Sequence, residues 1–412
     1  MKKQLMLIVP VMLVQAISNP VQTASASEQQ AISPKTLPSP EFSGPMSDLG
    51  KSLHAYGIDI GLSFINIYQN APKFGFSGGS AVNYGAFLFN ATANLSQDFQ
   101  IRYEQAINFP SYNVENYTFD ISNAFSPTPV VDSTTDLTRL TLQGNFLADR
   151  LEIEAGRMGL NRDFLKRGFC GGIGCINSTS ANTLGLPGEL LSVWGGRVGY
   201  NLASDTILGI GVIEDNPDNW QQNNGWDWGR GRSKGYIGIA NITQDESFLS
   251  DPRPLNYEVG VYHSSSSYSD ALYNSGWGNP TYGLNPTIID HESGTTGIYG
   301  QFRKVLWCCP PGAILPENVA IYGGVFHTFG EGQAYPWEAF AGVEYSGFWA
   351  QNPLAGLGFT IHYIGYAKNE RSTRLFFSGI DENSRGTHSS PMFTVGSASA
   401  RRVCLKSAWP IW

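Results

Sequence analysis

Apolar and polar residues alternate along many separate segments of this chain. From residue 56 to residue 64, apolar side chains occupy every second position, and Gly, Asp, Gly and Ser occupy the others. A period of two places the two sets on opposite faces of a β-strand. No segment shows a competing helical period. The pattern predicts thirteen strands, at residues 56–64, 84–95, 99–108, 140–146, 151–158, 192–202, 206–214, 236–240, 255–263, 296–305, 319–329, 337–348 and 357–366.

The connections between these strands alternate in length. Residues 96–98, 147–150 and 203–205 are tight, whereas residues 114–136, 159–191 and 264–295 are long. Short turns at one end and long loops at the other are typical of membrane barrels, and such long loops are uncommon in compact soluble domains. The fold predicted is therefore all-β, a transmembrane antiparallel β-barrel.

The N-terminus has the three parts of a secretory signal peptide. Lys2 and Lys3 precede an apolar run at residues 5–14, and Ala24-Ser25-Ala26 forms a small-residue cleavage site. The apolar run is too short to span a bilayer as a helix. We expect a cleaved signal at 1–26, an extended Pro-containing periplasmic leader at 27–50, and the barrel at 51–385, in a Gram-negative type of outer membrane.

The composition fits a surface that meets lipid. Only 15% of the residues are charged, against about 25% in ordinary soluble domains. The 10 Trp, 19 Tyr and 23 Phe suit the aromatic belts of a membrane protein. The net charge of -8 argues against a nucleic-acid partner. An exported soluble β-rich protein that binds carbohydrate shares this composition and stays the alternative of another class.

Charged residues on the polar face of the strands would line a water-filled lumen. Guanidinium forks and carboxylates hydrogen-bond to sugar hydroxyls, which both donate and accept. The alternative is that these charges pair with one another and only keep the lumen wet. The candidates for lining the pore are Arg102, Glu104, Arg139, Arg157 and Glu258, together with Glu152, Glu154 and Glu344.

A second candidate contact surface is rich in tryptophan. Residues 215–232 are DNPDNWQQNNGWDWGRGR, with Trp220, Trp226 and Trp228 among Asn, Gln and Arg. Such a cluster resembles a loop that contacts carbohydrate. Tryptophan is also common at membrane interfaces, and this second interpretation is the favoured one.

The cysteines and histidines point to no chemistry. Cys170 and Cys175 enclose GGIG and would close a small disulfide loop, while Cys308 and Cys309 are adjacent. No His stands at ligand spacing from either pair, so disulfides or free thiols are favoured over zinc. There is no HExxH motif. We expect no catalytic residue, no metal and no cofactor, and hence no enzyme.

Several segments, in order, resemble the carbohydrate-selective porin (OprB) family of Gram-negative outer membranes. They are EAGRMGLNRDFL at 154–165, LLSVWGGRVGY at 190–200, IGVIEDNPDNW at 210–220, LNYEVGVYHSSSSYSD at 255–270 and GIYGQFRKVLW at 297–307. The resemblance implies a sixteen-stranded passive pore for small sugars such as glucose, with loops folded inward, in contact with outer-membrane lipids and compatible with a homo-oligomer. It places Arg102, Glu104, Arg157, Trp194 and Arg197 near the constriction. A general or amino-acid-preferring pore is the alternative within transport.

The C-terminal segment departs from that family pattern. Residues 386–412 show no clear alternation, carry Arg401-Arg402, and place Pro410 where a strand would need a hydrogen-bond donor. Bacterial barrels have even strand numbers, whereas thirteen strands are predicted. We expect an incomplete barrel in which the reading frame shifts near Ser389 and roughly 60 residues carrying three strands are lost. Translation of the gene in its other frames tests this, and finding no alternating segment there would refute it.

Overall fold

The computed structural model describes fifteen strands of one large sheet and leaves many loops undescribed. The described residues are 11–12, 45–70, 81–112, 134–160, 163–165, 192–215, 224–226, 228, 233–266, 268–269, 290–291, 294–310, 316–329, 336–349, 356–365 and 392–398.

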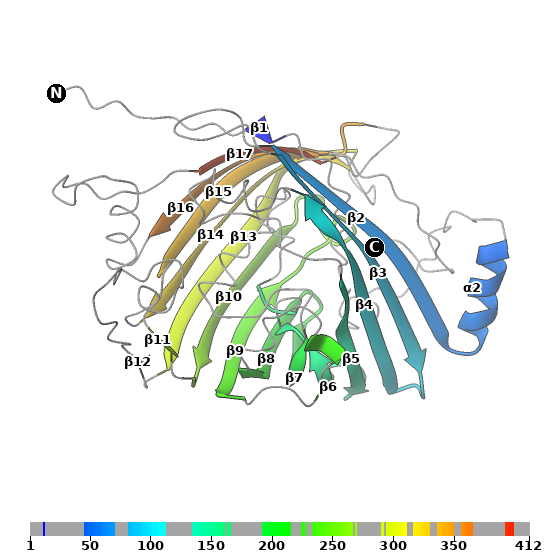
Figure 1. Ribbon diagram of the computed structural model, residues 1–412. Coiled ribbons are helices and arrows are strands. Elements are labelled where there is room, and N and C mark those ends of the chain that lie inside the picture. Colours follow the sequence, from blue (N-terminus) through cyan, green and yellow to red (C-terminus); the bar gives the residue numbers. More distant parts are fainter. Residues whose placement is uncertain are drawn as a thin grey trace, which may run out of the picture.

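From β2 to β17 the large sheet is a meander in which each of its strands pairs with the sheet's next strand along the chain (Figure 1). All thirteen predicted strands are present in it, and their ladders are antiparallel. They are β2 (Ile58–Asn70), β3 (Ala81–Asn94), β4 (Phe99–Tyr112), β5 (Thr134–Phe146), β6 (Leu151–Met158), β7 (Val193–Ala203), β8 (Thr206–Asp215), β9 (Gly235–Gln244), β10 (Leu255–Ser264), β13 (Thr295–Cys309), β14 (Glu317–Phe329), β15 (Trp337–Ser346) and β16 (Gly356–Gly365). Between β10 and β13, β11 (Tyr268–Ser269) and β12 (Asp290–His291) form a separate pair.

The sheet gains two strands where none was expected. β17 (Met392–Ala398) pairs antiparallel with β16, and β1 (Val11–Met12) pairs parallel with β17. The prediction of no strand beyond residue 366 is therefore wrong for residues 392–398. Phe393 and Val395 do alternate with Thr394 and Gly396, and the edge of β16 offers unpaired backbone groups. Among the described residues no ladder joins β2 to the β17 edge, so the sheet stays open.

A short helix precedes the first long strand. α2 (Pro45–Ala55) occupies residues that were expected to be extended leader and crosses the expected boundary at residue 50. Pro45 is tolerated because the first turn of a helix needs no N–H donor. Gly57, with φ of 74°, allows the chain to leave the helix and enter β2. Over the described part of the chain, no helix has the length and apolar character required to cross a membrane.

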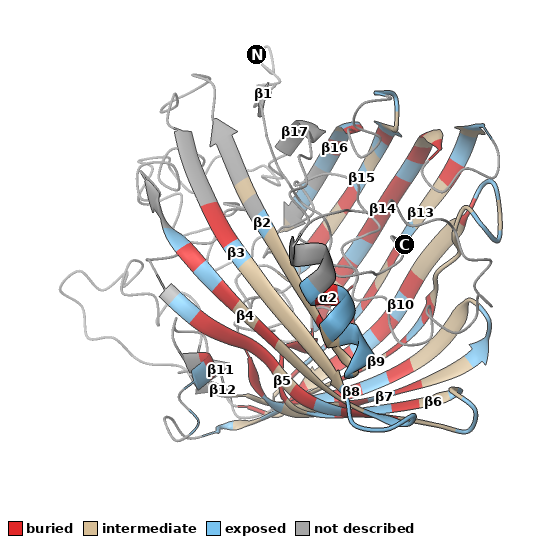
Figure 2. Cartoon of the chain, turned by 90° about the vertical axis from the view of Figure 1, so that its right-hand side faces the viewer, coloured by how far each residue is buried: buried red, intermediate tan, exposed pale blue. Residues whose placement is uncertain are grey.

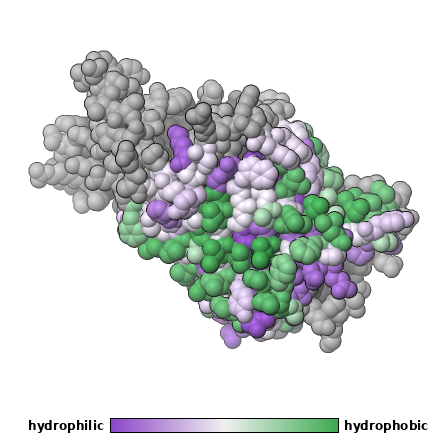
Figure 3. Space-filling view, turned by 90° about the horizontal axis from the view of Figure 1, so that it is seen from below, coloured by the Kyte–Doolittle hydropathy of each residue, from purple (hydrophilic) through white to green (hydrophobic). Residues whose placement is uncertain are grey.

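The two faces of the curved sheet differ in burial, and Figure 2 shows buried residues alternating with more exposed ones along several strands. The convex outer face carries exposed large apolar residues, and seen from below it is largely hydrophobic (Figure 3). The concave inner face carries buried polar, charged and aromatic residues. Outer-face residues include Phe64, Phe87, Ile107, Leu142, Ile153, Val198, Ile210, Val212, Ile242, Val259, Val261, Ile298, Phe302, Ile321, Val325, Val343, Phe359 and Ile361.

Candidate functional site

A charge-balanced cluster lies on the inner face of β4 to β7. Glu154 is at its centre and is fully buried: its Oε2 lies 2.7 Å from Arg197 Nε, and its Oε1 lies 3.3 Å from Arg139 Nε. Arg102 Nη1 lies 3.7 Å from the same carboxylate, and Thr141 Oγ1 donates a hydrogen bond to it at 2.5 Å. Buried charges persist when they are paired and hydrogen-bonded. The cluster consists of three guanidinium groups and three carboxylates, from Arg102, Arg139, Arg197, Glu152, Glu154 and Asp163.

One member of the cluster comes from a loop that enters the sheet's concave side. We call residues 160 and 163–165, which follow β6, the inner segment. Its Asp163 accepts a hydrogen bond from Arg139 Nη2 at 2.6 Å and lies 3.4 Å from Arg197 Nε. The ring of Phe164 packs on Gly211, where an added Cβ would come within 2.7 Å of it. Glycine is required at that position of β8 because the inner segment lies directly against the backbone.

The far end of the inner segment is held by Glu258 of β10. The backbone N–H of Leu165 donates to Glu258 Oε1 at 2.7 Å, and so do Asn241 Nδ2 and Tyr299 Oη at the same distance. Gln301 Nε2 donates to Oε2 at 2.8 Å. Four donors satisfy this fully buried carboxylate, so Glu258 serves to fix the inner segment in place.

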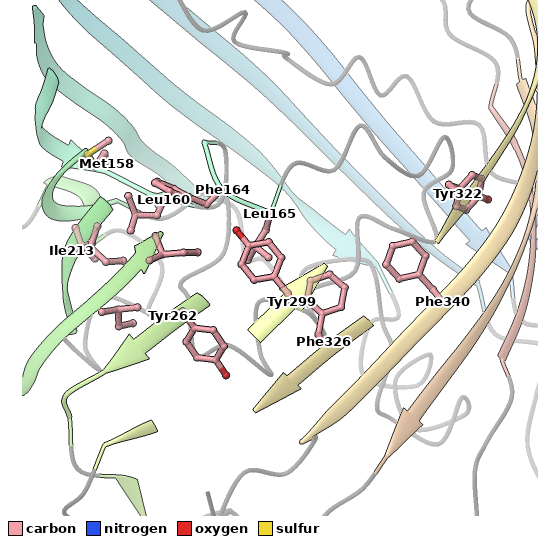
Figure 4. Packing of buried hydrophobic residues seen from close by; sticks show 13 residues of the cluster. Met158, Leu160, Phe164, Leu165, Ile213, Tyr262, Tyr299, Tyr322, Phe326 and Phe340 are labelled. Carbon is pink, nitrogen blue, oxygen red and sulfur yellow. The ribbon is translucent and has the colours of Figure 1, made fainter. Parts of the chain in front are cut away.

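A row of aromatic rings continues from Glu258 across the inner face of β13, β14 and β15 (Figure 4). Tyr299 and Phe326 are stacked with centroids 5.8 Å apart, Phe326 and Phe340 are stacked at 6.1 Å, and Phe340 and Tyr322 are tilted at 6.5 Å. We call these four residues the aromatic row. Three of its rings lie over a glycine that is the direct cross-strand partner: Tyr299 over Gly260, Phe340 over Gly324 and Tyr322 over Gly342.

The structure places most of the predicted lining residues on the inner face. Glu104 faces Arg139 in the β4–β5 register, and Arg197 faces Glu154 across β6 and β7. Together with Arg102, Glu152, Glu258 and Glu344, these residues are the inward-facing part of the predicted set. Their contact with a permeating sugar stays a prediction.

Two predicted lining residues have the parity of the other face. Trp194 is 43% exposed and has the same strand parity as the exposed Val198, whereas Arg197 has the opposite parity. Arg157 is the cross-strand partner of Trp194, and its guanidinium lies 5.7 Å from the centre of that indole ring. Arg157 is itself buried, with Nη1 3.5 Å from the carboxylate of Glu214. The expectation that Arg157 and Trp194 line the lumen is therefore not met by their positions.

Two tryptophans of the segment at residues 215–232 contact aromatic residues of the outer face. Trp228 meets Trp194 edge to face at 5.7 Å, and Trp226 lies 6.3 Å from the ring of Tyr103. The backbone N–H of Gly225 donates to Asp136 of β5 at 2.7 Å. Asp136 lies in the part of β5 that extends beyond the end of the shorter strand β6. This position favours a membrane-interface role over sugar contact, because such rings belong at lipid headgroups. Trp220 lies outside the described residues.

The cysteine predictions are tested only in part. Cys308 and Cys309 are free thiols, and Cys170 and Cys175 lie outside the described residues. No group of three or more metal-ligating side chains is found within the described ranges.

Comparison with known proteins decides the family. A family model described as "Carbohydrate-selective porin, OprB family" matches residues 79–389, about three quarters of the chain. The chain belongs to this family. It is 28% identical over 152 residues to Porin B of Pseudomonas aeruginosa, a match that covers 35% of this chain and only 32% of that relative. The high-pH structure of Pseudomonas putida OprB is 18% identical with a TM-score of 0.66, covering 82% of each chain, and supports the porin fold.

Some site residues escaped the sequence-based prediction. Asp163 stands in a loop with no periodic pattern, and its neighbours in sequence give no sign that it returns to the wall. For the aromatic row, the alternation indicates only that these rings belong to barrel strands. Tyr262, Tyr299 and Tyr322 each lie opposite a glycine of the neighbouring strand. This pairing of a large side chain with a glycine can be recognised only once the strand register is known.

Proposed function

We propose that this chain forms an outer-membrane pore through which small carbohydrates such as glucose diffuse down their gradient. The observation that carries the proposal is the inner face: a buried cluster of three guanidinium groups and three carboxylates on one wall and a row of aromatic rings on the other. The outer face is apolar and suits lipid.

The balance of charge in this cluster bears on what would pass. A lumen whose charges are mostly of one sign favours ions of the opposite sign. A lumen with equal numbers of positive and negative groups favours neither, and its donors and acceptors interact with neutral polar solutes through hydrogen bonds. Sugar hydroxyls both donate and accept, and the C–H faces of a sugar ring suit aromatic surfaces. Family membership supports the same substrate class.

The inner segment is the element we assign to the constriction. It lies on the concave side of the sheet, bound through Asp163 to the charged wall and through Leu165 to Glu258 of β10. Its two anchor points would hold a narrow passage at a fixed width. A cleaved export signal at 1–26 completes the proposal for the chain.

Liposome swelling tests this function. The purified chain is reconstituted in liposomes, and swelling rates are compared for glucose, arabinose and amino acids of similar size. Faster entry of the sugars is expected. Equal rates would refute the sugar preference in favour of a general or amino-acid pore. A chain that stays soluble and monomeric without detergent, and causes no swelling, would refute the pore itself.

A further inference from the structure

A second polar cluster lies on the inner face, away from the cluster around Glu154. Arg303 of β13 donates from Nη2 to Asn318 Oδ1 at 3.2 Å, and the same nitrogen lies 3.6 Å from Glu344 Oε2. Asn318 and Glu344 stand on β14 and β15, and their alternation places them among the buried inner-face residues. These three residues are here called the exit cluster.

The exit cluster is as accessible as the rim of the first cluster. The side chains of Arg303 and Glu344 keep 13% and 10% of their surface exposed, and those of Arg102 and Glu152 keep 12% and 11%. Only the centre of the first cluster, at Arg139 and Glu154, is closed, with 1% and 0% exposed.

Glu344 also has an unfilled hydrogen-bonding capacity. Its residue is 8% exposed, and its Oε2 accepts no hydrogen bond although it is buried; the neighbouring Arg303 is beyond hydrogen-bond distance. The other oxygen, Oε1, accepts from Ser346 Oγ. A buried carboxylate oxygen without a donor is costly, because it has lost its water and gained no bond in exchange. A hydroxyl donor bound at this point would remove that cost.

The aromatic row ends at the same place. Tyr322 is the direct cross-strand partner of Arg303, and the row leads from it through Phe340 and Phe326 to Tyr299, which donates to Glu258 beside the inner segment. Figure 4 shows these rings pointing away from the strands toward the concave side. The row therefore connects the inner segment with the exit cluster.

We propose that Arg303, Asn318 and Glu344 form a second carbohydrate-binding station at the short-turn end of the lumen. The unfilled Glu344 oxygen accepts from a sugar hydroxyl, while Arg303 and Asn318 donate to neighbouring hydroxyl oxygens, which matches the mixed donors and acceptors of a neutral sugar. Asn318 follows the connection at residues 310–316 and Glu344 precedes the one at 347–355. In the meander these two connections lie at the same end of the sheet as the tight turns at residues 147–150 and 204–205. Short turns face the periplasm in barrels of this kind, so a sugar would meet this station on leaving. The inference rests on the proposed function.

Ion current through the full chain in a planar bilayer tests the station, with glucose as the probe. The quantity measured is the glucose concentration that reduces the current by half. Glu344→Gln removes the charge at nearly constant size and should raise that concentration about three- to tenfold, the effect of losing one charge-assisted hydrogen bond. Arg303→Lys keeps the charge but loses the planar fork, and should raise it about twofold to threefold.

A matched control lies on the same wall. Glu317 of β14 accepts a hydrogen bond from Tyr345 Oη. Both residues have the parity of the outer face of their strands, so they lie away from the lumen. Glu317→Gln should leave the half-blocking glucose concentration unchanged. A conducting pore in which neither Glu344→Gln nor Arg303→Lys changes that concentration overturns the station alone. A wild-type chain that conducts no ions in glucose-free salt overturns the proposed function and the station with it.

Discussion

Substitution of Glu154 by glutamine should destabilise the fold more than the same substitution of Glu152 on the same strand. The carboxylate is completely buried and lies within 3.7 Å of three guanidinium groups, those of Arg102, Arg139 and Arg197. The substitution keeps the size of the side chain but leaves three positive charges against two negative ones. Asp163 still contacts Arg139 and Arg197, and Glu152 still contacts Arg197, but the cluster loses the one carboxylate that all three arginines share.

The magnitude follows from what happens when one partner of a buried ion pair is removed. Measured costs are about 3–5 kcal/mol, because the remaining charges stay desolvated without compensation. The hydrogen bond that the new amide oxygen would keep with Thr141 recovers about 1 kcal/mol. We therefore expect the free energy of unfolding to fall by about 2–4 kcal/mol.

The assay compares two glutamates of one strand. Folded barrels resist detergent and migrate differently from unfolded chains on a gel, so the fraction folded is followed against temperature or urea for wild type, Glu154→Gln and Glu152→Gln. Glu152 is also on the inner face of β6, but its side chain is 11% exposed and pairs with a single arginine. Its substitution should cost about 1 kcal/mol. Equal stability of Glu154→Gln and wild type, or of the two variants, would refute the central role of Glu154.

Three further predictions concern the inner segment, the aromatic row and the outer face. Asp163→Ala frees the inner segment from the charged wall, so single-channel conductance in salt should rise and the swelling preference for glucose should fall; unchanged conductance would contradict its placement at the constriction. Gly260→Ala puts a Cβ 2.5 Å from the ring of Tyr299, which is held by stacking and a hydrogen bond, and should lower the free energy of unfolding by about 1–2 kcal/mol. Gly300→Ala, where the nearest atom is 3.8 Å away, is its control and should be neutral by the same gel assay. Trp194→Ala should reduce thermal stability in lipid while glucose swelling stays at the wild-type rate, and a selective loss of glucose entry would return that residue to the lumen.

Strand parity explains why Arg157 and Trp194 lie away from the charged cluster. Arg157 and Glu154 are three residues apart on one strand, so they have opposite parity and face opposite sides. The same holds for Trp194 and Arg197. The sequence-based prediction that these two residues line the lumen rested on charge and family likeness and not on strand parity. Their positions do not agree with it. An arginine of the outer parity is tolerated near the end of β6 because Glu214, an indole ring and the carbonyl of Ser192 are its partners.

The sequence by itself determined the thirteen strands, their two faces and the alternation of short and long connections, because each of these follows from the period of two and from chain lengths. It could not determine where the long loops go. Only the tertiary structure brought Asp163 back to Arg139 and Arg197, aligned the aromatic row with its glycines, and placed Arg303 beside Glu344. Those contacts join residues far apart in the chain, and they depend on strand register and loop path, which local patterns leave undefined.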